Sequence, residues 1–180
     1  IKCFEKCIQI DPKNSQTYLN LGNLFVILRK YNEAKKSFDK AISLSNISAM
    51  SLSDQFCVER HKNDFLDLVK NKLEIIFANE QEILSLIDAK SIEEVINFSK
   101  QLKKKIIITR GDKGALAIVQ NEVFECSAQK NLKIVDLTGA GDLFAAGYLH
   151  GTINNLSIPE CLEKATELSS KVIEKIGARI

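Results

Sequence analysis

The sequence predicts an α/β domain over residues 49–180, preceded by an all-helical segment over residues 1–48. Three observations lead to this fold class. The N-terminal segment is similar to itself at an offset of 34 residues, a period typical of helix-pair repeats. After residue 49, short β-branched runs alternate with stretches of helical spacing, which indicates a mainly parallel sheet with flanking helices. A glycine-rich turn at residues 139–141 then joins a strand-like run to a helix.

Composition excludes several classes of protein. Of the 180 residues 45% are apolar and 27% are charged, which is enough to build packed cores and argues against wholesale disorder. A net charge of +2 creates no field that would recruit nucleic acid or a membrane surface. No apolar run approaches the roughly 20 residues of a membrane span, and no secretory signal is visible at the start. Five cysteines without a Cys-x-x-Cys pair fit a reduced, cytoplasmic protein.

The helical segment shows its repeat through matched positions. At the offset of 34, Phe4 aligns with Phe38 and Ile8 aligns with Ile42. We expect one helix over residues 15–28 and a second over residues 33–44. Asp11-Pro12 should end a preceding helix, because proline is common just beyond a helix C-terminus.

This segment resembles the tetratricopeptide repeat. The matching large and small packing residues are Tyr18, Leu21, Gly22, Phe25, Ala34, Phe38 and Ala41. Small residues allow two antiparallel helices to approach closely, while aromatic residues fill the space beside them. Two interpretations of the segment remain open: a surface that binds a protein partner, and a structural spacer.

The α/β part is predicted element by element from its apolar runs. The expected strands cover residues 73–78, 105–109, 115–120, 122–126 and 133–136, and the expected helices cover residues 83–87, 92–103 and 143–150. Ligands of such sheets collect at the carboxyl ends of the strands, where the glycine-rich turns of this sequence lie.

The segment 136–144, Asp-Leu-Thr-Gly-Ala-Gly-Asp-Leu-Phe, carries the clearest chemistry. Gly139 and Gly141 allow backbone N–H groups to converge at a helix N-terminus, which suits a phosphate group. Asp142 in that position is kept ionised by the helix end and can accept a proton from an attacking alcohol. The alternative is an ordinary helix N-terminus capped by an acid.

These residues resemble the Asp-Thr-x-Gly-Ala-Gly-Asp signature of the ribokinase and adenosine kinase family, also called the pfkB family. Residues 79–82 are similar to its Asn-x-x-Glu element, and residues 109–114 are similar to its Thr-x-Gly-x-x-Gly turn. Residues 176–179 resemble the loop that closes over the nucleotide base. Residues 51–61 are similar to a strand and loop of the adenosine-kinase-like branch. The resemblance covers residues 50–180 and implies a partial ribokinase-like fold.

The resemblance implies ATP, Mg²⁺ and K⁺ as cofactors, and it implies a role for each matching residue. Asp142 would be the general base, beside an anion hole formed by Gly139, Ala140 and Gly141. The remaining roles are water-mediated Mg²⁺ binding by Glu82 with Asn79, ATP binding by Thr109, Gly111, Gly114, Gly177 and Ala178, and K⁺ binding by the backbone carbonyls of Asp136 and Thr138.

Family members also carry an N-terminal half that supplies much of the acceptor pocket, and this sequence has repeat residues in its place. A sheet interrupted there should expose a strand edge. Two functions therefore stay open. The first is an ATP-dependent phosphotransferase acting on a hydroxymethyl group of a sugar or an adenosine-like nucleoside. The second is a catalytically incomplete interaction module that keeps a nucleotide half-site. The expected partners are that small molecule and a protein bound through the repeat or as a complementing chain.

Overall fold

A computed structural model describes residues 1–179, which form two compact units that meet between Ser48 and Ala49. The first unit is entirely helical, as expected. Its helices are α1 (Lys2–Ile10), α2 (Ser15–Ile27) and α3 (Tyr31–Leu44).

Close packing of α2 against α3 depends on one small residue. An ideal Cβ built on Gly22 would lie 2.5 Å from the Phe38 ring, so a larger side chain would displace that ring. The side chain of Asn14 caps α2 by accepting a hydrogen bond of 3.0 Å from the Thr17 N–H. The first predicted helix is confirmed. The second ends at Leu44 as predicted but begins at Tyr31, two residues earlier than expected.

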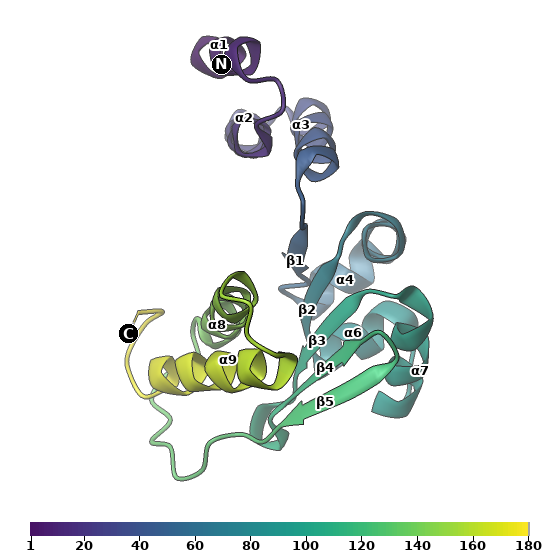
Figure 1. Ribbon diagram of the computed structural model, residues 1–180, viewed down its shortest axis with the longest axis vertical. Helices are drawn as coiled ribbons and strands as arrows, with labels where there is room; N and C mark the ends of the chain where they lie inside the picture. The colour runs from purple at the N-terminus through teal and green to yellow at the C-terminus, as the bar shows by residue number, and fades with distance from the viewer. Residues whose placement is uncertain (180) are drawn as a thin grey trace. The chain divides into compact units, whose positions relative to one another are not determined.

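The second unit is built on a five-stranded sheet in which the strands lie in chain order (Figure 1). The strands β1, β2 and β3 are mutually parallel, and β4 and β5 continue the sheet as an antiparallel hairpin. Only β4 runs against the other strands of this sheet, which confirms the α/β expectation. The strands are β1 (Ala49–Ser51), β2 (Ile75–Asn79), β3 (Lys105–Thr109), β4 (Ala115–Val119) and β5 (Glu122–Cys126).

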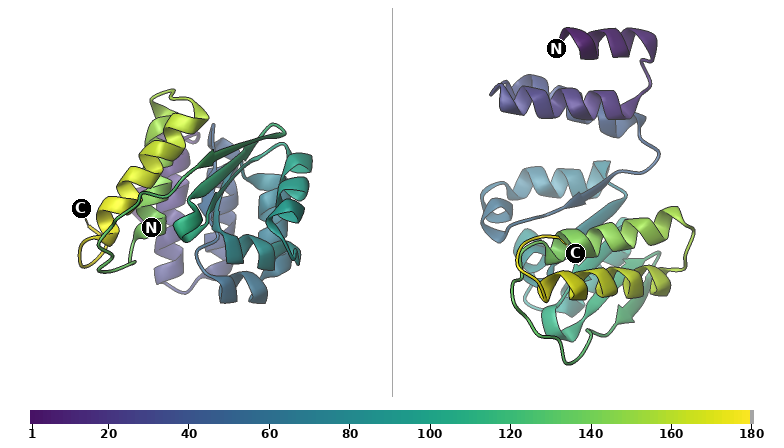
Figure 2. Two further views of the ribbon diagram at one scale, coloured as in Figure 1. Left: turned by 90° about the horizontal axis from the view of Figure 1, so that it is seen from below. Right: turned by 90° about the vertical axis from the view of Figure 1, so that its left-hand side faces the viewer.

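Helices cover both faces of this sheet (Figure 2). One face carries α4 (Gln55–Arg60), α5 (Lys62–Asp67), a π-helical turn (Leu68–Lys72), α6 (Glu80–Ile87) and α7 (Ile92–Leu102). The other face carries α8 (Ala140–Ile153) and α9 (Ile158–Ile173), and a short 3₁₀ turn (Gly111–Lys113) joins β3 to β4.

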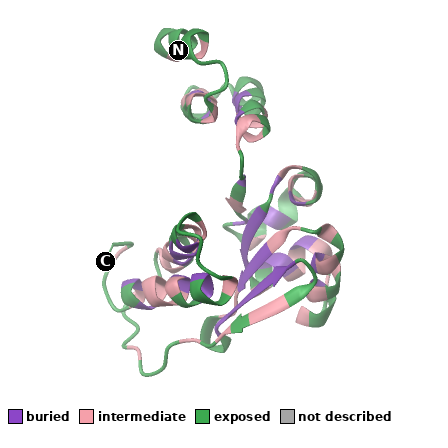
Figure 3. Cartoon of the chain, viewed as in Figure 1, coloured by how far each residue is buried: buried purple, intermediate pink, exposed green. Residues whose placement is uncertain are grey.

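Alternating strand residues form two cores. Figure 3 shows that the central strands of the sheet are largely buried. In β3, Ile106 and Ile108 face the α4 to α7 layer, while Ile107 between them faces α8 and α9. All three are fully buried, because a sheet covered on both faces needs apolar side chains on both. In the second core, the Tyr148 ring meets the Phe77 ring edge to face at a centroid distance of 5.7 Å.

The strand predicted over residues 133–136 is wrong. This segment has no regular structure, and Ile134 and Val135 are largely exposed. The Val135 N–H donates to the carbonyl of Ile173 at 2.8 Å, at the end of α9. Its β-branched residues are typical of a strand. The segment nevertheless forms backbone hydrogen bonds with the C-terminal end of α9 and not with a strand of the sheet.

Several predicted boundaries also change. The helix expected over residues 143–150 begins at Ala140 and reaches Ile153, because the glycine turn itself enters the helix. The strand and loop expected over residues 51–61 contain a helix, α4, which starts where the Asp54 carboxylate accepts a 2.9 Å hydrogen bond from the Cys57 N–H.

The expected exposed edge is confirmed at β1. Within residues 1–179 this strand pairs only with β2, and it is three residues long. The Ser53 hydroxyl donates to the carbonyl of Ser51 at 3.2 Å, so local side-chain bonding limits the unpaired backbone.

Small residues determine how closely α8 approaches α9. An ideal Cβ on Gly147 would lie 2.7 Å from the Cα of Ala165 and 2.9 Å from the carbonyl oxygen of Lys164. Both contacts are with backbone atoms, so the helices would have to separate to accommodate a methyl group. The two helices thus pack backbone to backbone at this crossing.

We therefore expect Gly147→Ala to lower the free energy of unfolding by about 1–3 kcal/mol through overpacking. Gly141→Ala is the matched control, since a Cβ at that helical position meets nothing within 4 Å. That variant should be neutral or more stable by up to about 1 kcal/mol, because alanine favours helix. Urea denaturation of both variants measures the difference, and equal changes would contradict the packing argument.

Candidate functional site

A cleft of about 570 Å³ opens in the α/β unit at the carboxyl ends of β1, β2 and β3. It is closed on one side by the N-terminus of α8. The predicted site residues that line it are Asn79, Glu82, Thr109, Gly139, Ala140, Gly141 and Asp142. Three separate sequence motifs thus converge on one cavity.

Strand register explains this convergence. Asn79 is the last residue of β2, Thr109 is the last residue of β3, and the two are direct partners in the parallel ladder. Their side chains fall on the same face as Phe77 and Ile107, which is the face covered by α8. Parallel strands that end together therefore present both polar groups to the α8 N-terminus.

Asn79 and Glu82 form a capping box that begins α6. The Asn79 side-chain oxygen accepts from the Glu82 N–H at 2.8 Å, and the Glu82 carboxylate accepts from the Asn79 N–H at 2.9 Å and from its Nδ2 at 2.8 Å. Burial raises the pKa of Glu82 above its ordinary value, although the bond from the Asn79 backbone opposes the shift. A buried carboxylate on a cleft wall is a suitable outer ligand for a hydrated divalent cation.

The turn before α8 presents backbone N–H groups to the cleft. Gly139 has a φ of +81°, a left-handed conformation that favours glycine, and its carbonyl accepts the first helical hydrogen bond from Leu143 at 2.9 Å. The Ala140 N–H donates to the carbonyl of Leu137 at 3.2 Å, so one of the three predicted anion-hole amides is engaged. An ideal Cβ at Gly141 would meet nothing within 4 Å. Gly141 is the second residue of α8, and N–H groups in the first turn of a helix lack a partner within the helix, so this amide is a candidate donor to an anion.

Asp142 lies in the first turn of α8 and is exposed to the cleft. Within residues 1–179 its carboxylate makes no hydrogen bond or ion pair. A carboxylate without a protein partner, at a helix N-terminus beside a glycine turn, is a chemical group that can accept a proton from a hydroxyl group bound nearby.

Four predicted residues lie behind the turn rather than in the cleft wall. The Asp136 carboxylate accepts hydrogen bonds from the Thr138 N–H at 2.9 Å, the Thr138 hydroxyl at 2.7 Å and the Gly177 N–H at 2.9 Å. The bonds from the Thr138 and Gly177 backbone are the main reason that the pKa of Asp136 is lowered. A Cβ on Gly139 would come within 2.6 Å of the Ala178 Cβ. The C-terminal loop is therefore fastened to the glycine turn.

The remaining predicted glycines, Gly111 and Gly114, border the turn after β3 and do not line the cleft. An ideal Cβ built on Gly111 would meet no other atom within 4 Å. Gly114, with a φ of +86°, faces the Cys126 carbonyl oxygen so closely that a Cβ would lie 2.0 Å from it. Gly114 is thus required by the packing of the turn against the end of β5.

Seven further residues line the cleft that have no role assigned from the sequence: Ser51, Ser53, Phe77, Ala78, Ile107, Leu137 and Phe144. Two of them, Ser51 and Ser53, add hydroxyl groups from the β1 side. Ser53 has a φ of +68°, which is strained for a residue other than glycine, and such strain is frequent at functional sites. An unusual backbone angle leaves no trace in the sequence at a serine.

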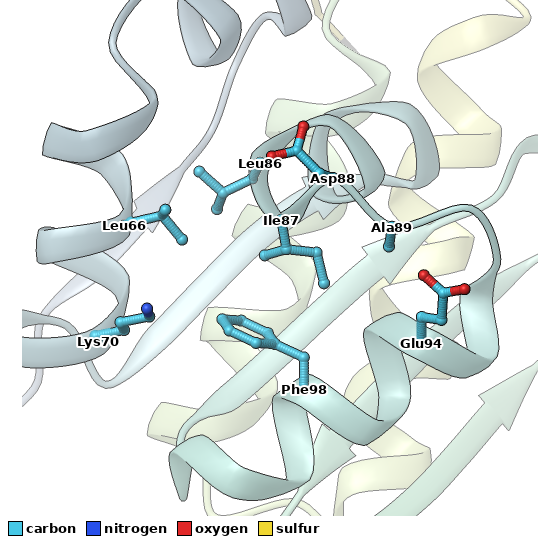
Figure 4. Close-up of a pocket in the computed structure, with 8 residues that line it drawn as sticks. All are labelled: Leu66, Lys70, Leu86, Ile87, Asp88, Ala89, Glu94 and Phe98. Atoms are coloured by element: carbon cyan, nitrogen blue, oxygen red, sulfur yellow. The ribbon is translucent and has the colours of Figure 1, made fainter.

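A smaller hollow of about 310 Å³ lies on the α4 to α7 side (Figure 4). Its walls are mainly apolar, from Leu66, Ile87 and Phe98, with Lys70 above the Phe98 ring at 5.9 Å. The Glu94 carboxylate at its rim already accepts from the Lys90 N–H. It offers fewer uncommitted polar groups than the first cleft.

Two kinds of feature are absent from residues 1–179. None of the helices in this range combines the length and apolar character needed to cross a membrane. In the same part of the chain, no three His, Cys, Asp or Glu side chains gather as a direct metal site.

Comparison with known proteins agrees with this geometry. The pattern of the pfkB family of carbohydrate kinases matches residues 26–180, and that of the tetratricopeptide repeat matches residues 3–36. A cytidine kinase of Thermococcus kodakarensis is 32% identical over 118 residues, which cover 64% of this chain and 42% of that protein. Both resemblances drawn from the motifs are therefore confirmed.

Two solved structures are similar over 82% of this chain and 46% of their own. The adenosine kinase from Sinorhizobium meliloti has a TM-score of 0.78 at 32% identity, and a probable sugar kinase from Rhizobium etli has a TM-score of 0.76 at 35% identity. This chain thus spans less than half the length of each of these three relatives. With the family pattern extending over most of its residues, the chain belongs to the pfkB family of carbohydrate kinases.

Proposed function

We propose that the α/β unit binds ATP with Mg²⁺ and belongs to a kinase that phosphorylates a hydroxymethyl group of a sugar or nucleoside. The observation that carries this proposal is the meeting of Asp142, the open glycine turn and the Asn79–Glu82 pair in one cleft. Relatives at about a third identity include a cytidine kinase, an adenosine kinase and a probable sugar kinase, which supports a proposal that names both acceptor classes.

Asp142 is the general base of this proposal. It takes the proton of the acceptor hydroxyl as that oxygen attacks the γ-phosphorus of ATP. The amides of Gly139 and Gly141, with Ala140 once its bond to Leu137 opens, stabilise the negative charge on the transferred group.

The cofactors follow from the donor groups present. Glu82 and Asn79 organise the waters of a Mg²⁺ ion bound to the ATP phosphates, because their own hydrogen bonds fix the carboxylate at the cleft wall. Thr109 and Gly111 border the nucleotide, and Gly114 shapes that turn. Gly177 and Ala178 close over the base, and the carbonyls of Asp136 and Thr138 provide oxygen ligands suited to K⁺.

The acceptor site needs more protein than this chain supplies. Since the chain spans less than half of each of these three relatives, a complementing segment or chain would complete the pocket beside β1. The helical unit would recruit a protein partner, as repeats of this kind do. All five cysteines are free, which fits a cytoplasmic protein.

The second candidate function is an interaction module that binds nucleotide without transferring phosphate. The tetratricopeptide repeat matched at residues 3–36 favours it, because repeats of this kind provide surfaces for protein partners. The two candidates share the nucleotide half-site and differ only in turnover.

Calorimetric titration with ATP and Mg²⁺ tests the half-site. The wild-type chain should bind, and Asp142→Ala should bind about as well, since the base acts on the acceptor. Gly141→Val should lose at least about tenfold in affinity, because its side chain fills the open space where the phosphate approaches.

The outcomes separate the candidates. Binding with phosphoryl transfer to cytidine or adenosine, abolished in Asp142→Ala, supports the kinase. Binding without transfer supports the interaction module. Absence of binding by a folded wild-type chain would refute both.

A second prediction concerns magnesium. Glu82→Gln should reduce the gain in ATP affinity that Mg²⁺ provides, with little change in affinity measured in EDTA. Because burial raises the pKa of Glu82, the Mg²⁺-dependent gain should fall on acidification at a higher pH than an exposed glutamate would give. Titrations with and without Mg²⁺ across pH check both statements, and an unchanged Mg²⁺ gain in Glu82→Gln would contradict the assigned role.

A further inference from the structure

The turn between β3 and β4 is joined to α6 by the carboxylate of Glu80, the residue that follows the end of β2. Asn79 and Thr109 are the last partners of the β2–β3 ladder, and both line the cleft. The residues that directly follow them are Glu80 and Arg110. These two form an ion pair, in which the Arg110 Nε lies 3.4 Å from the Glu80 Oε2.

A second cation from the same turn reaches the same oxygen. The Lys113 Nζ lies 3.7 Å from the Glu80 Oε2, so both ends of the 3₁₀ turn converge on one carboxylate. The side chains of Arg110 and Glu80 are 17% and 24% exposed, so solvent screens their pair less than an ordinary surface ion pair.

The turn has few other polar attachments to α6. Its backbone hydrogen bonds are internal: the Arg110 N–H donates to the carbonyl of Gly114, and the Gly114 N–H donates to the carbonyl of Gly111. Among the described residues, the ion pairs and hydrogen bonds between this turn and α6 all involve Glu80.

We propose that Glu80 is a positioning residue, which holds the Gly111–Lys113 turn in register with the Asn79–Glu82 capping box. This inference rests on the proposed nucleotide site. It adds to that proposal a residue that fixes the position of the 3₁₀ turn relative to the capping box. Glu80 does not itself line the cleft and acts through Arg110 and Lys113.

The direction in which ATP affinity changes when the Glu80 charge is removed distinguishes a positioning role from direct electrostatic repulsion. A carboxylate near bound phosphates repels them, so removal of its charge alone would tighten ATP binding. A positioning carboxylate has the opposite effect, because its loss releases the turn and lowers the population of the binding-competent geometry.

The test compares Glu80→Gln with Asp88→Asn. Asp88 caps the other end of α6, forms an ion pair with Lys62 and has a φ of +55° that asparagine tolerates. Each variant removes one negative charge from one ion-paired end of the same helix. Hydrogen–deuterium exchange of the 109–114 peptide and titration with ATP and Mg²⁺ are measured for the full chain at low and high salt.

We expect Glu80→Gln to speed exchange of the 109–114 peptide and to weaken ATP binding about fivefold, while Asp88→Asn changes neither. High salt should shrink the difference between wild type and Glu80→Gln, since it screens the pairs. Unchanged exchange, unchanged affinity or tighter binding in Glu80→Gln would overturn the inference. If the wild-type chain binds no ATP, the proposed function fails, and the exchange comparison still decides whether Glu80 holds the turn.

Discussion

The parallel register of β1, β2 and β3 is the constraint on which the site depends. Because the three strands run the same way and end at the same edge, residues distant in sequence, such as Ser51, Asn79 and Thr109, meet at one cleft. The α8 N-terminus then faces them across the second core, where Phe77 packs against Tyr148. If β2 shifted by one residue against β3, the side chains of Asn79 and Thr109 would point to opposite faces of the sheet and would no longer meet in one cleft.

Much of this arrangement is predictable from local patterns. Asn79 with Glu82, and Gly139 with Asp142, are close in sequence, so capping preferences and glycine spacing are enough to identify them. The strands are predicted correctly where the burial of both sheet faces demands long apolar runs, as at residues 105–109. Such features depend on near neighbours, and near neighbours are visible in a sequence.

Other features depend on distant contacts, and sequence patterns do not reveal them. The run 133–136 has strand composition, but its amides bond to the end of α9, about forty residues further along the chain. The bond that engages the Ala140 amide and the positive φ of Ser53 arise from the shape of a turn and have no compositional signature. The motif assigns Gly114 to nucleotide binding, whereas its contact with Cys126 shows a packing requirement as well.

The identity between strand order and chain order has a consequence for how the protein is made. Each strand of the sheet is laid beside the one synthesised just before it, so the sheet can grow on the ribosome without waiting for later segments. The α8 and α9 layer and the Gly177 loop fastened to Asp136 follow the sheet in the chain. The glycine turn at residues 139–141 is therefore completed only after these five strands have emerged, and a nascent chain that has made this sheet alone still lacks the wall of the cleft that α8 provides.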